Sequence, residues 1–244
     1  AEKGELTEGE ELGHHLRIAQ LLRQQPIVVA ELDLPGSDTS NLAFSPDGRH
    51  AALQSDGALH IVSTDSWTTL RQIPLLDGQR PVDVVMPDND HVLLASAGGV
   101  TLYNWRASNS LTHTFAPLFS ANGNRTIQSF GISAGAAKFA TGNSDGSIHL
   151  WDLTNRKLIK EQTLGIQTGA QVAFNLDGSR LAAWANDYQR RRYPVQLFDG
   201  TTLEPVCDLH ELHNFVDTIA FSQDGSVMVV GVNDRKLPLY DGLV

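Results

Sequence analysis

The sequence has a single cysteine, Cys207, so no disulfide bond can form within the chain. It also lacks any apolar run of the roughly 18 residues or more that a membrane-spanning helix needs. The first residues, AEKGELTEGEE, are acidic and polar, unlike a secretory signal or a mitochondrial transit peptide. Because free thiols and the lack of a leader are typical of a reducing compartment, the expected location is the cytoplasm.

Basic residues are also scarce. The chain has 18 Lys and Arg residues against 28 Asp and Glu residues, which gives a formal net charge of -10 at pH 7. A protein that binds nucleic acid or anionic membranes through its overall charge is more often basic. The sequence does not contain the Gly-x-x-x-x-Gly-Lys-Ser/Thr loop that binds nucleotide phosphates, and no cofactor is expected.

The feature that organises the chain is a repeat. The segment NLAFSPDGRHAAL (41–53) returns in altered form at 82–94, 171–183 and 217–230, with a weaker copy at 129–141. An apolar anchor residue before each turn recurs at intervals of 41 to 47 residues. These anchors are Phe44, Val85, Ile132, Phe174 and Phe221. This period is typical of arrays in which each repeat is one small sheet.

Each repeat is predicted to contain four short strands. Runs such as NLAF and TIAF are apolar and show little helical periodicity. Turns of the type Pro-Asp-Gly or Gln-Asp-Gly follow them, because glycine permits positive φ and aspartate bonds its own backbone. A second strand, an Asp-Gly or Gly-Gly hairpin and a third strand come next, as in FATGNS and SDGSIHLWD. A more variable fourth segment closes the repeat.

On these residues the chain resembles the WD40-repeat family of β-propellers over about 27–244, best at 127–164 with GNSDGSIHLWD. The resemblance implies an all-β fold of four-stranded blades. Only one repeat ends in Trp-Asp, at Trp151-Asp152, while Phe198-Asp199 and Tyr240-Asp241 are conservative versions. The Gly-His pair that precedes the first strand in this family is missing. The family's buried His–Ser/Thr–Asp–Trp network is therefore not expected in most blades.

Five blades are expected, at approximately 37–76, 80–119, 126–165, 169–209 and 215–244. The segment 26–36 reads as a strand that completes the last blade and closes the ring, so that no edge is left open. Seven blades, the commoner number in this family, remain an alternative if the chain is partial or two blades are degenerate.

Residues 1–25 carry apolar residues at helical spacing and a capping box at Thr7 and Glu10. They are predicted to form an N-terminal helix, either packed on the propeller or linking it to another domain.

Several motifs that resemble reactive sites are better explained by this architecture. Gly131-Ile132-Ser133-Ala134-Gly135 matches a nucleophile elbow, but a strand rather than a helix follows it. Cys207, His210 and His213 carry zinc-binding atoms, yet their spacing does not match the metalloprotease motif. SDGSIHLWD is interpreted as a turn and a strand, with Trp151 packed between blades. No catalytic residue and no metal site are predicted.

The expected binding surface is the face formed by the second-to-third and fourth-to-first connections, here called the top face. Its longest loop, NDYQRRRYP (186–194), places three arginines between two tyrosines. Arginine binds carboxylates and phosphates bidentately and stacks on planar groups. A solvated hairpin tip, or pairing of the arginines with Asp187 and Asp234, is the alternative. The candidate residues are Arg80, Arg125, Tyr188, Arg190, Arg191, Arg192, Tyr193, Arg235 and Lys236.

The sequence therefore favours a non-enzymatic module that binds a protein partner, acidic or phosphorylated, through the top-face loops. It could be the regulatory C-terminal domain of a larger protein. One alternative is a propeller hydrolase or lyase with a site in the central channel, for which Asp83 and Asp217 on first strands are the only candidates. Another is nucleic-acid sensing through the arginines, which would show steep salt dependence. No membrane partner is expected.

Overall fold

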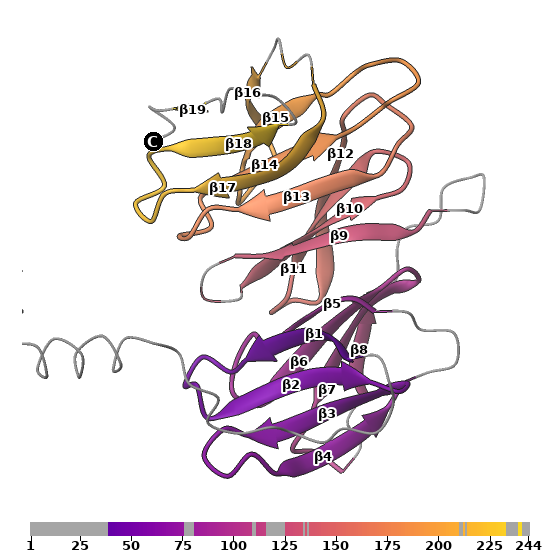
Figure 1. Ribbon diagram of the computed structural model, residues 1–244, viewed down its shortest axis with the longest axis vertical. Helices are drawn as coiled ribbons and strands as arrows, with labels where there is room; N and C mark the ends of the chain where they lie inside the picture. Colours follow the sequence, from indigo (N-terminus) through magenta and orange to yellow (C-terminus); the bar gives the residue numbers. More distant parts are fainter. Residues whose placement is uncertain are drawn as a thin grey trace, which may run out of the picture. The chain divides into compact units, whose positions relative to one another are not determined.

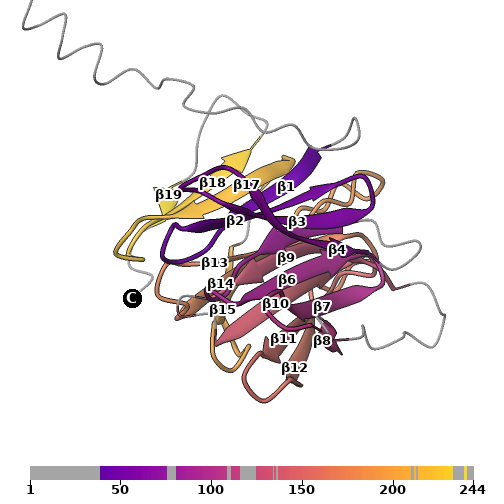
Figure 2. The same ribbon diagram turned by 90° about the horizontal axis from the view of Figure 1, so that it is seen from below.

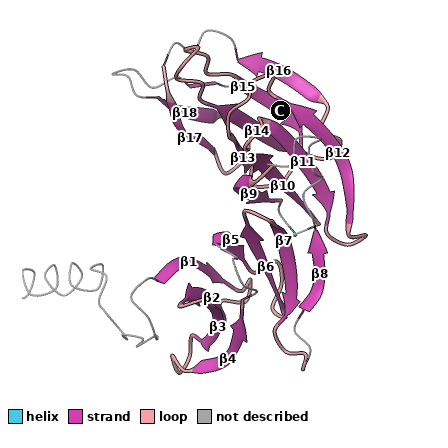
Figure 3. Cartoon of the chain, turned by 90° about the vertical axis from the view of Figure 1, so that its right-hand side faces the viewer, coloured by secondary structure: helices cyan, strands magenta, loops and turns pink. Residues whose placement is uncertain are grey.

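The structure is a computed structural model that describes residues 39–75, 81–108, 111–115, 125–133, 135, 137–209, 212, 214–232 and 239–240. All of them belong to one compact unit, residues 34–244. The regular elements in this part of the chain are strands, as predicted, and Figure 3 shows no helix among them. The predicted helix at 1–25 and the predicted closing strand at 26–36 lie outside the described residues.

The strands form five separate antiparallel sheets that follow one another along the chain (Figure 1). The first sheet consists of β1 (Thr39–Phe44), β2 (His50–Ser55), β3 (Ala58–Ser63) and β4 (Thr69–Pro74). The second sheet consists of β5 (Pro81–Val85), β6 (His91–Ser96), β7 (Gly99–Asn104) and β8 (Leu111–Phe115). The third sheet consists of β9 (Ile127–Ile132), β10 (Lys138–Asn143), β11 (Ser147–Asp152) and β12 (Lys157–Thr163).

The last two sheets repeat the pattern. The fourth sheet consists of β13 (Ala170–Phe174), β14 (Arg180–Ala185), β15 (Val195–Asp199) and β16 (Pro205–Leu209). The fifth has three described strands, β17 (Val216–Phe221), β18 (Met228–Val232) and β19 (Leu239–Tyr240). Each strand pairs with the next in sequence, so every sheet is a simple meander, as the third sheet shows in Figure 2.

The sheets pack face to face, with their first strands in contact. Contacts join β1 to β5, β5 to β9, β9 to β13 and β13 to β17. An apolar cluster fills each boundary between neighbouring sheets, and the cluster between the second and third sheets contains Phe115, Phe139 and Trp151. Because both faces of an inner strand are covered, β3, β7 and β11 share the burial pattern of five buried residues followed by one half-buried residue. Such strands lack the alternation of a half-exposed sheet.

A β-bulge recurs at the same place in four sheets, between the third and fourth strands. It lies at Ile61/Val62, Leu102/Tyr103, Leu150/Trp151 and Leu197/Phe198. A bulge bends its strand and increases the local twist. The sequence analysis did not anticipate this feature, because the extra residue falls in the variable fourth segment and carries no glycine signal.

The hairpin between β10 and β11 explains why the SDGS turn needs its glycine. Gly146 has φ +80°, and a Cβ at this position would lie 2.0 Å from the carbonyl oxygen of Ile166. Asp145 accepts hydrogen bonds from the backbone N–H and the hydroxyl of Ser147, at 3.1 and 2.6 Å. The turn is thus structural, and Trp151 on the strand after it is 7% exposed.

Candidate partner-binding site

The loop at 186–194 is held in a defined shape between β14 and β15. Asp187 and Arg192 exchange backbone hydrogen bonds of 2.9 and 3.1 Å across the loop. The buried carboxylate of Asp187 accepts the backbone N–H of Arg190 and its Nη1, both at 3.0 Å. Asn186 bonds both the N–H and the carbonyl of Val216, which joins the loop to the fifth sheet. The nine-residue loop between β14 and β15, longer than the equivalent hairpins of the first three sheets, is therefore fixed to the fourth and fifth sheets by hydrogen bonds.

Asp187 is stabilised in its charged form. The backbone N–H of Arg190 is the main cause that holds the pKa of this carboxyl below its usual value, and the Arg190 guanidinium adds to the effect. A carboxylate that accepts several hydrogen bonds is favoured over the neutral acid. The predicted alternative, in which Asp187 pairs with an arginine, thus applies to Arg190.

The other two arginines of the loop have no such partner. Arg191 and Arg192 are exposed, and no ion pair involves either side chain within the described residues. Arg191 has φ +50°, a left-handed backbone conformation that is uncommon for a residue other than glycine. Because Arg190 already pairs with Asp187, Arg191 and Arg192 add two positive charges to the loop that no acidic side chain of the described residues neutralises. Asp234, the other predicted acidic partner, lies outside those residues.

The two tyrosines of the loop have different roles. Tyr188 is 66% exposed, and its ring stacks on Phe215 with ring centroids 5.2 Å apart and an angle of 22° between the planes. Tyr193 is half-buried and packs against the apolar cluster between the fourth and fifth sheets. The exposed ring of Tyr188 thus adds a planar apolar surface to the loop that carries Arg191 and Arg192. Phe215 was not among the predicted residues, because only the fold brings it from the β16–β17 connection to the loop.

Arg125 differs from the arginines of the loop. Its side chain is only 10% exposed and forms ion pairs with Asp145 at 2.7 Å and Glu161 at 3.1 Å. Its Nη1 also lies 2.9 Å from Nε2 of His149. The guanidinium is therefore occupied by internal partners and is not presented to solvent as the loop arginines are. Arg80, Arg235 and Lys236 lie outside the described residues.

His149 lies at the centre of this internal group and is fully buried. Burial is the main cause that lowers its pKa, the nearby Arg125 lowers it further, and the charges of Glu161 and Asp145 oppose the change. In the same sheet the indole N–H of Trp151 donates to the hydroxyl of Thr141 at 3.3 Å. The third sheet thus contains a hydrogen bond from Trp151 to Thr141, and the turn residue Asp145 forms its ion pair with Arg125.

The residues that resembled catalytic or metal sites occupy structural positions. The hydroxyl of Ser133 donates to the carbonyl of Lys138 at 3.0 Å and accepts its N–H at 3.1 Å, in a turn between two strands. Cys207 is exposed on β16. His210 and His213 lie outside the described residues, and the described part contains no group of three or more His, Cys, Asp or Glu residues that could hold a metal ion.

The two acidic residues of the enzymatic alternative are on different sheets. Asp83 lies on β5 and Asp217 on β17. Burial raises the pKa of Asp83, while the N–H of Val84, which its carboxylate accepts at 2.8 Å, partly opposes this. In the part of the chain that the structure describes, no hydrogen bond or ion pair joins either residue to a histidine. No helix among those residues is long and apolar enough to span a bilayer.

Comparison with known proteins identifies the same repeat and the same fold. The family model "WD domain, G-beta repeat" matches residues 109–152, which run from β8 to the end of β11. Transducin beta-like protein 3 of Rattus norvegicus is 23% identical over 194 residues, an alignment that covers 80% of this chain and 24% of that protein. The chain thus spans about a quarter of the length of this curated relative.

A structural match covers a larger share of this chain, and of the matched protein, than the sequence match does. The solved β-propeller domain of Cps50 (Swd1) from Myceliophteria thermophila superposes with a TM-score of 0.69 at 12% sequence identity, over 88% of this chain and 73% of that one. The five sheets described above, each a meander packed on the next, are the blades of this architecture. The chain therefore carries a WD40 repeat and folds as a WD40-repeat β-propeller.

Proposed function

We propose that the protein is a non-enzymatic interaction module that binds an acidic or phosphorylated segment of a protein partner through the loop at 186–194. The observation that carries this proposal is a pair of exposed arginines, Arg191 and Arg192, which form no ion pair within the described residues and lie on a loop that Asp187 holds in shape. Loops on a rigid scaffold are the usual place for binding residues. The propeller fold, which generally serves interaction scaffolds, supports the same reading.

The charge of the loop is opposite to that of the whole protein, whose formal net charge is -10. Guanidinium groups bind carboxylates and phosphates with paired hydrogen bonds, and these charge-assisted bonds are about twice as strong as neutral ones. Arg190 then acts mainly on the loop, and Arg191 and Arg192 act on the partner. A cytoplasmic location and a role as part of a larger regulatory protein belong to the same proposal.

The test compares two charge-matched double variants. Arg191→Ala with Arg192→Ala should weaken binding of a phosphoserine-containing peptide by about tenfold or more, because each charge-assisted bond contributes about 1.5–3 kcal/mol. Arg49→Ala with Lys157→Ala removes the same charge from two exposed positions, one in a first-to-second connection and one at the start of β12, at the other end of the strands. We expect this control to change affinity by less than about twofold.

Fluorescence anisotropy with the phosphorylated, glutamate-substituted and unmodified forms of one peptide would provide the measurement. Equal affinity of the phosphorylated and unmodified peptides for the unaltered protein would contradict the proposal. A single-stranded oligonucleotide should be included, because the stack of Tyr188 on Phe215 beside the arginines also suits bases. Tight oligonucleotide binding with a steep loss of affinity in salt would favour nucleic-acid sensing instead.

A further inference from the structure

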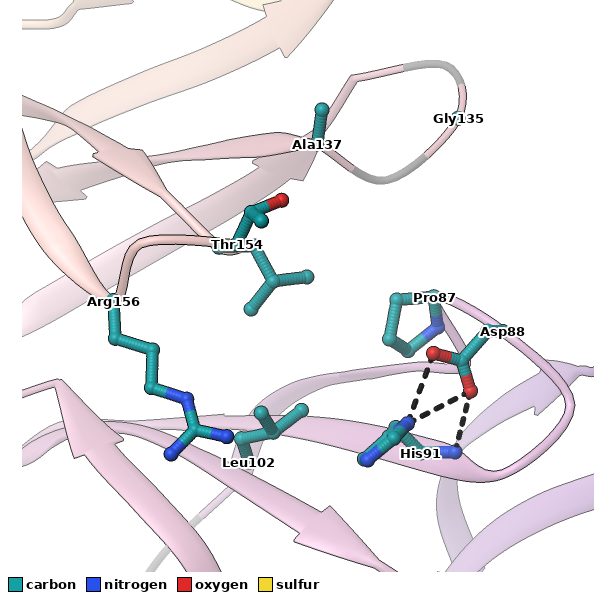
Figure 4. A pocket seen from close by; sticks show the side chains of 9 residues that line it. Pro87, Asp88, His91, Leu102, Gly135, Ala137, Thr154 and Arg156 are labelled. Atoms are coloured by element: carbon teal, nitrogen blue, oxygen red, sulfur yellow. Dashed lines mark hydrogen bonds and ion pairs between the residues drawn. The ribbon is translucent and has the colours of Figure 1, made fainter.

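A cavity of about 360 Å³ opens between the second and third sheets (Figure 4). Its lining comes from the β5–β6 turn, β6, β7, the β9–β10 turn and the β11–β12 turn. These turns are first-to-second and third-to-fourth connections, so in each meander they lie at the opposite end of the strands from the loop at 186–194. The cavity is therefore separate from the site proposed above.

The lining is mixed, with slightly more polar than apolar surface. Pro87, Leu102, Ala137 and Leu153 line the cavity together with the polar residues Thr154 and Arg156. In Figure 4 the side chain of Arg156 extends from the β11–β12 turn towards Leu102 and His91. A cavity that combines apolar side chains with a few polar groups can hold a small ligand that has an apolar body and a charged end.

Arg156 supplies the one uncompensated charge among the lining residues. The carboxylate of Asp88 accepts the backbone N–H groups of Asp90 and His91, both at 2.8 Å, and lies 2.9 Å from Nδ1 of the His91 ring. Within the described residues no ion pair involves Arg156, which is exposed. The negative charge of Asp88 is thus engaged locally, while the guanidinium remains available to an anion.

The repeat offers an internal comparison for Arg156. Trp67, Arg156 and Leu203 each lie four residues after the end of a third strand, with φ of 54, 56 and 57°. Leu203 is fully buried in the apolar cluster between the third and fourth sheets. At the boundary between the second and third sheets the matching residue is an exposed arginine, and a cavity lies beside it. The position that Leu203 fills at the boundary between the third and fourth sheets is thus occupied by Arg156 at the boundary between the second and third sheets.

We propose that this cavity is a second binding site, for a small apolar carboxylate. The apolar body of the ligand packs on Leu102, Leu153 and Ala137, and its carboxylate pairs with the guanidinium of Arg156. The volume lies near the lower end of the range of roughly 300–1,000 Å³ that is typical of ligand pockets. The site therefore accommodates a small acid or the last residue of a peptide, and these share the same chemistry.

Three probes test this assignment in titrations of the intact protein monitored by methyl NMR of its leucines. N-acetylphenylalanine represents a peptide end, 3-phenylpropionate a free acid, and N-acetylphenylalaninamide is the neutral match. We expect at least one of the acids to bind about tenfold or more tightly than the amide, with shifts at Leu102 and Leu153. Tighter binding of N-acetylphenylalanine would identify a peptide end as the ligand, and tighter binding of 3-phenylpropionate would identify a free acid.

Two variants and a control complete the experiment. Arg156→Gln should remove the preference for the acid, and Arg156→Leu should abolish acid binding by placing a leucine where the next boundary has Leu203. Lys157→Gln removes the same charge from the adjacent exposed position, and we expect a change of less than about twofold. Equal binding of acid and amide, no binding of either acid, or unchanged affinity in Arg156→Gln would overturn the assignment.

Discussion

At the scale of single residues, arginines that look alike in the sequence have opposite roles. Arg125 is largely buried and paired with Asp145 and Glu161, whereas Arg191 is exposed at the tip of a loop. Removing the largely buried Arg125 would leave the partly exposed Asp145 and Glu161 without their cation and would open a gap in the packing, which is destabilising. An exposed arginine without an ion pair contributes little to the free energy of unfolding.

We therefore predict that Arg125→Ala lowers the free energy of unfolding by about 1–3 kcal/mol, because Asp145 and Glu161 are partly exposed and water screens part of the interaction. Arg191→Ala should change it by less than about 0.5 kcal/mol. Urea denaturation followed by tryptophan fluorescence measures both variants under the same conditions. If the two substitutions had equal effects on stability, the internal role of Arg125 would be wrong.

At the scale of elements, strand β11 places the buried His149 in contact with the charged side chains of Arg125 and Glu161. The fully buried His149 on this strand has a pKa below its ordinary value of 6.5, first because of burial and then because of Arg125. The folded state therefore binds a proton at this site less readily than the unfolded chain does. The stabilisation from neutral His149 is complete above the unfolded pKa and is lost as the pH falls from about 6.5 towards the lower folded pKa.

The expected result is a free energy of unfolding that decreases between pH 7.5 and pH 5.5. His149→Gln should show a shallower slope over this window, because a glutamine does not titrate. The measurement is a series of urea unfolding curves at closely spaced pH values for both proteins. A slope that is the same with and without the histidine would contradict the prediction, even if the variant were less stable throughout.

At the scale of the whole molecule, the fifth sheet differs from the other four in having three described strands. The sequence predicts that residues 26–36 supply its fourth strand and that residues 1–25 form a helix outside the ring. Because closing a propeller satisfies the open edge of its last blade, the two segments should contribute differently to stability. This difference can be measured without knowing the partner.

Removal of residues 1–25 should leave the thermal midpoint within a few degrees of that of the full chain. Removal of residues 1–36 should lower it further, because the backbone groups of an edge strand would lose their partners and an apolar face would be exposed. Differential scanning calorimetry of the three chains provides the comparison. Identical midpoints for the two truncated forms would show that 26–36 does not close the last sheet.

The sequence by itself determined the repeat and its strands. Phe44, Phe174 and Phe221 mark first strands, and Asp145-Gly146 marks a hairpin, because local turn chemistry and apolar runs act over a few residues. The recurring bulge between the third and fourth strands had no comparable signal, because its extra residue lies in the variable fourth segment and is not a glycine.

The tertiary structure alone decided which charged residues are free. Arg125 and Arg191 carry the same side chain, and only the approach of Asp145, His149 and Glu161 engages the first. The same holds for the stack of Tyr188 on Phe215 and for the cavity beside Arg156. Ion pairs, stacking and cavities depend on distances between segments far apart in the chain, and a single sequence does not contain those distances.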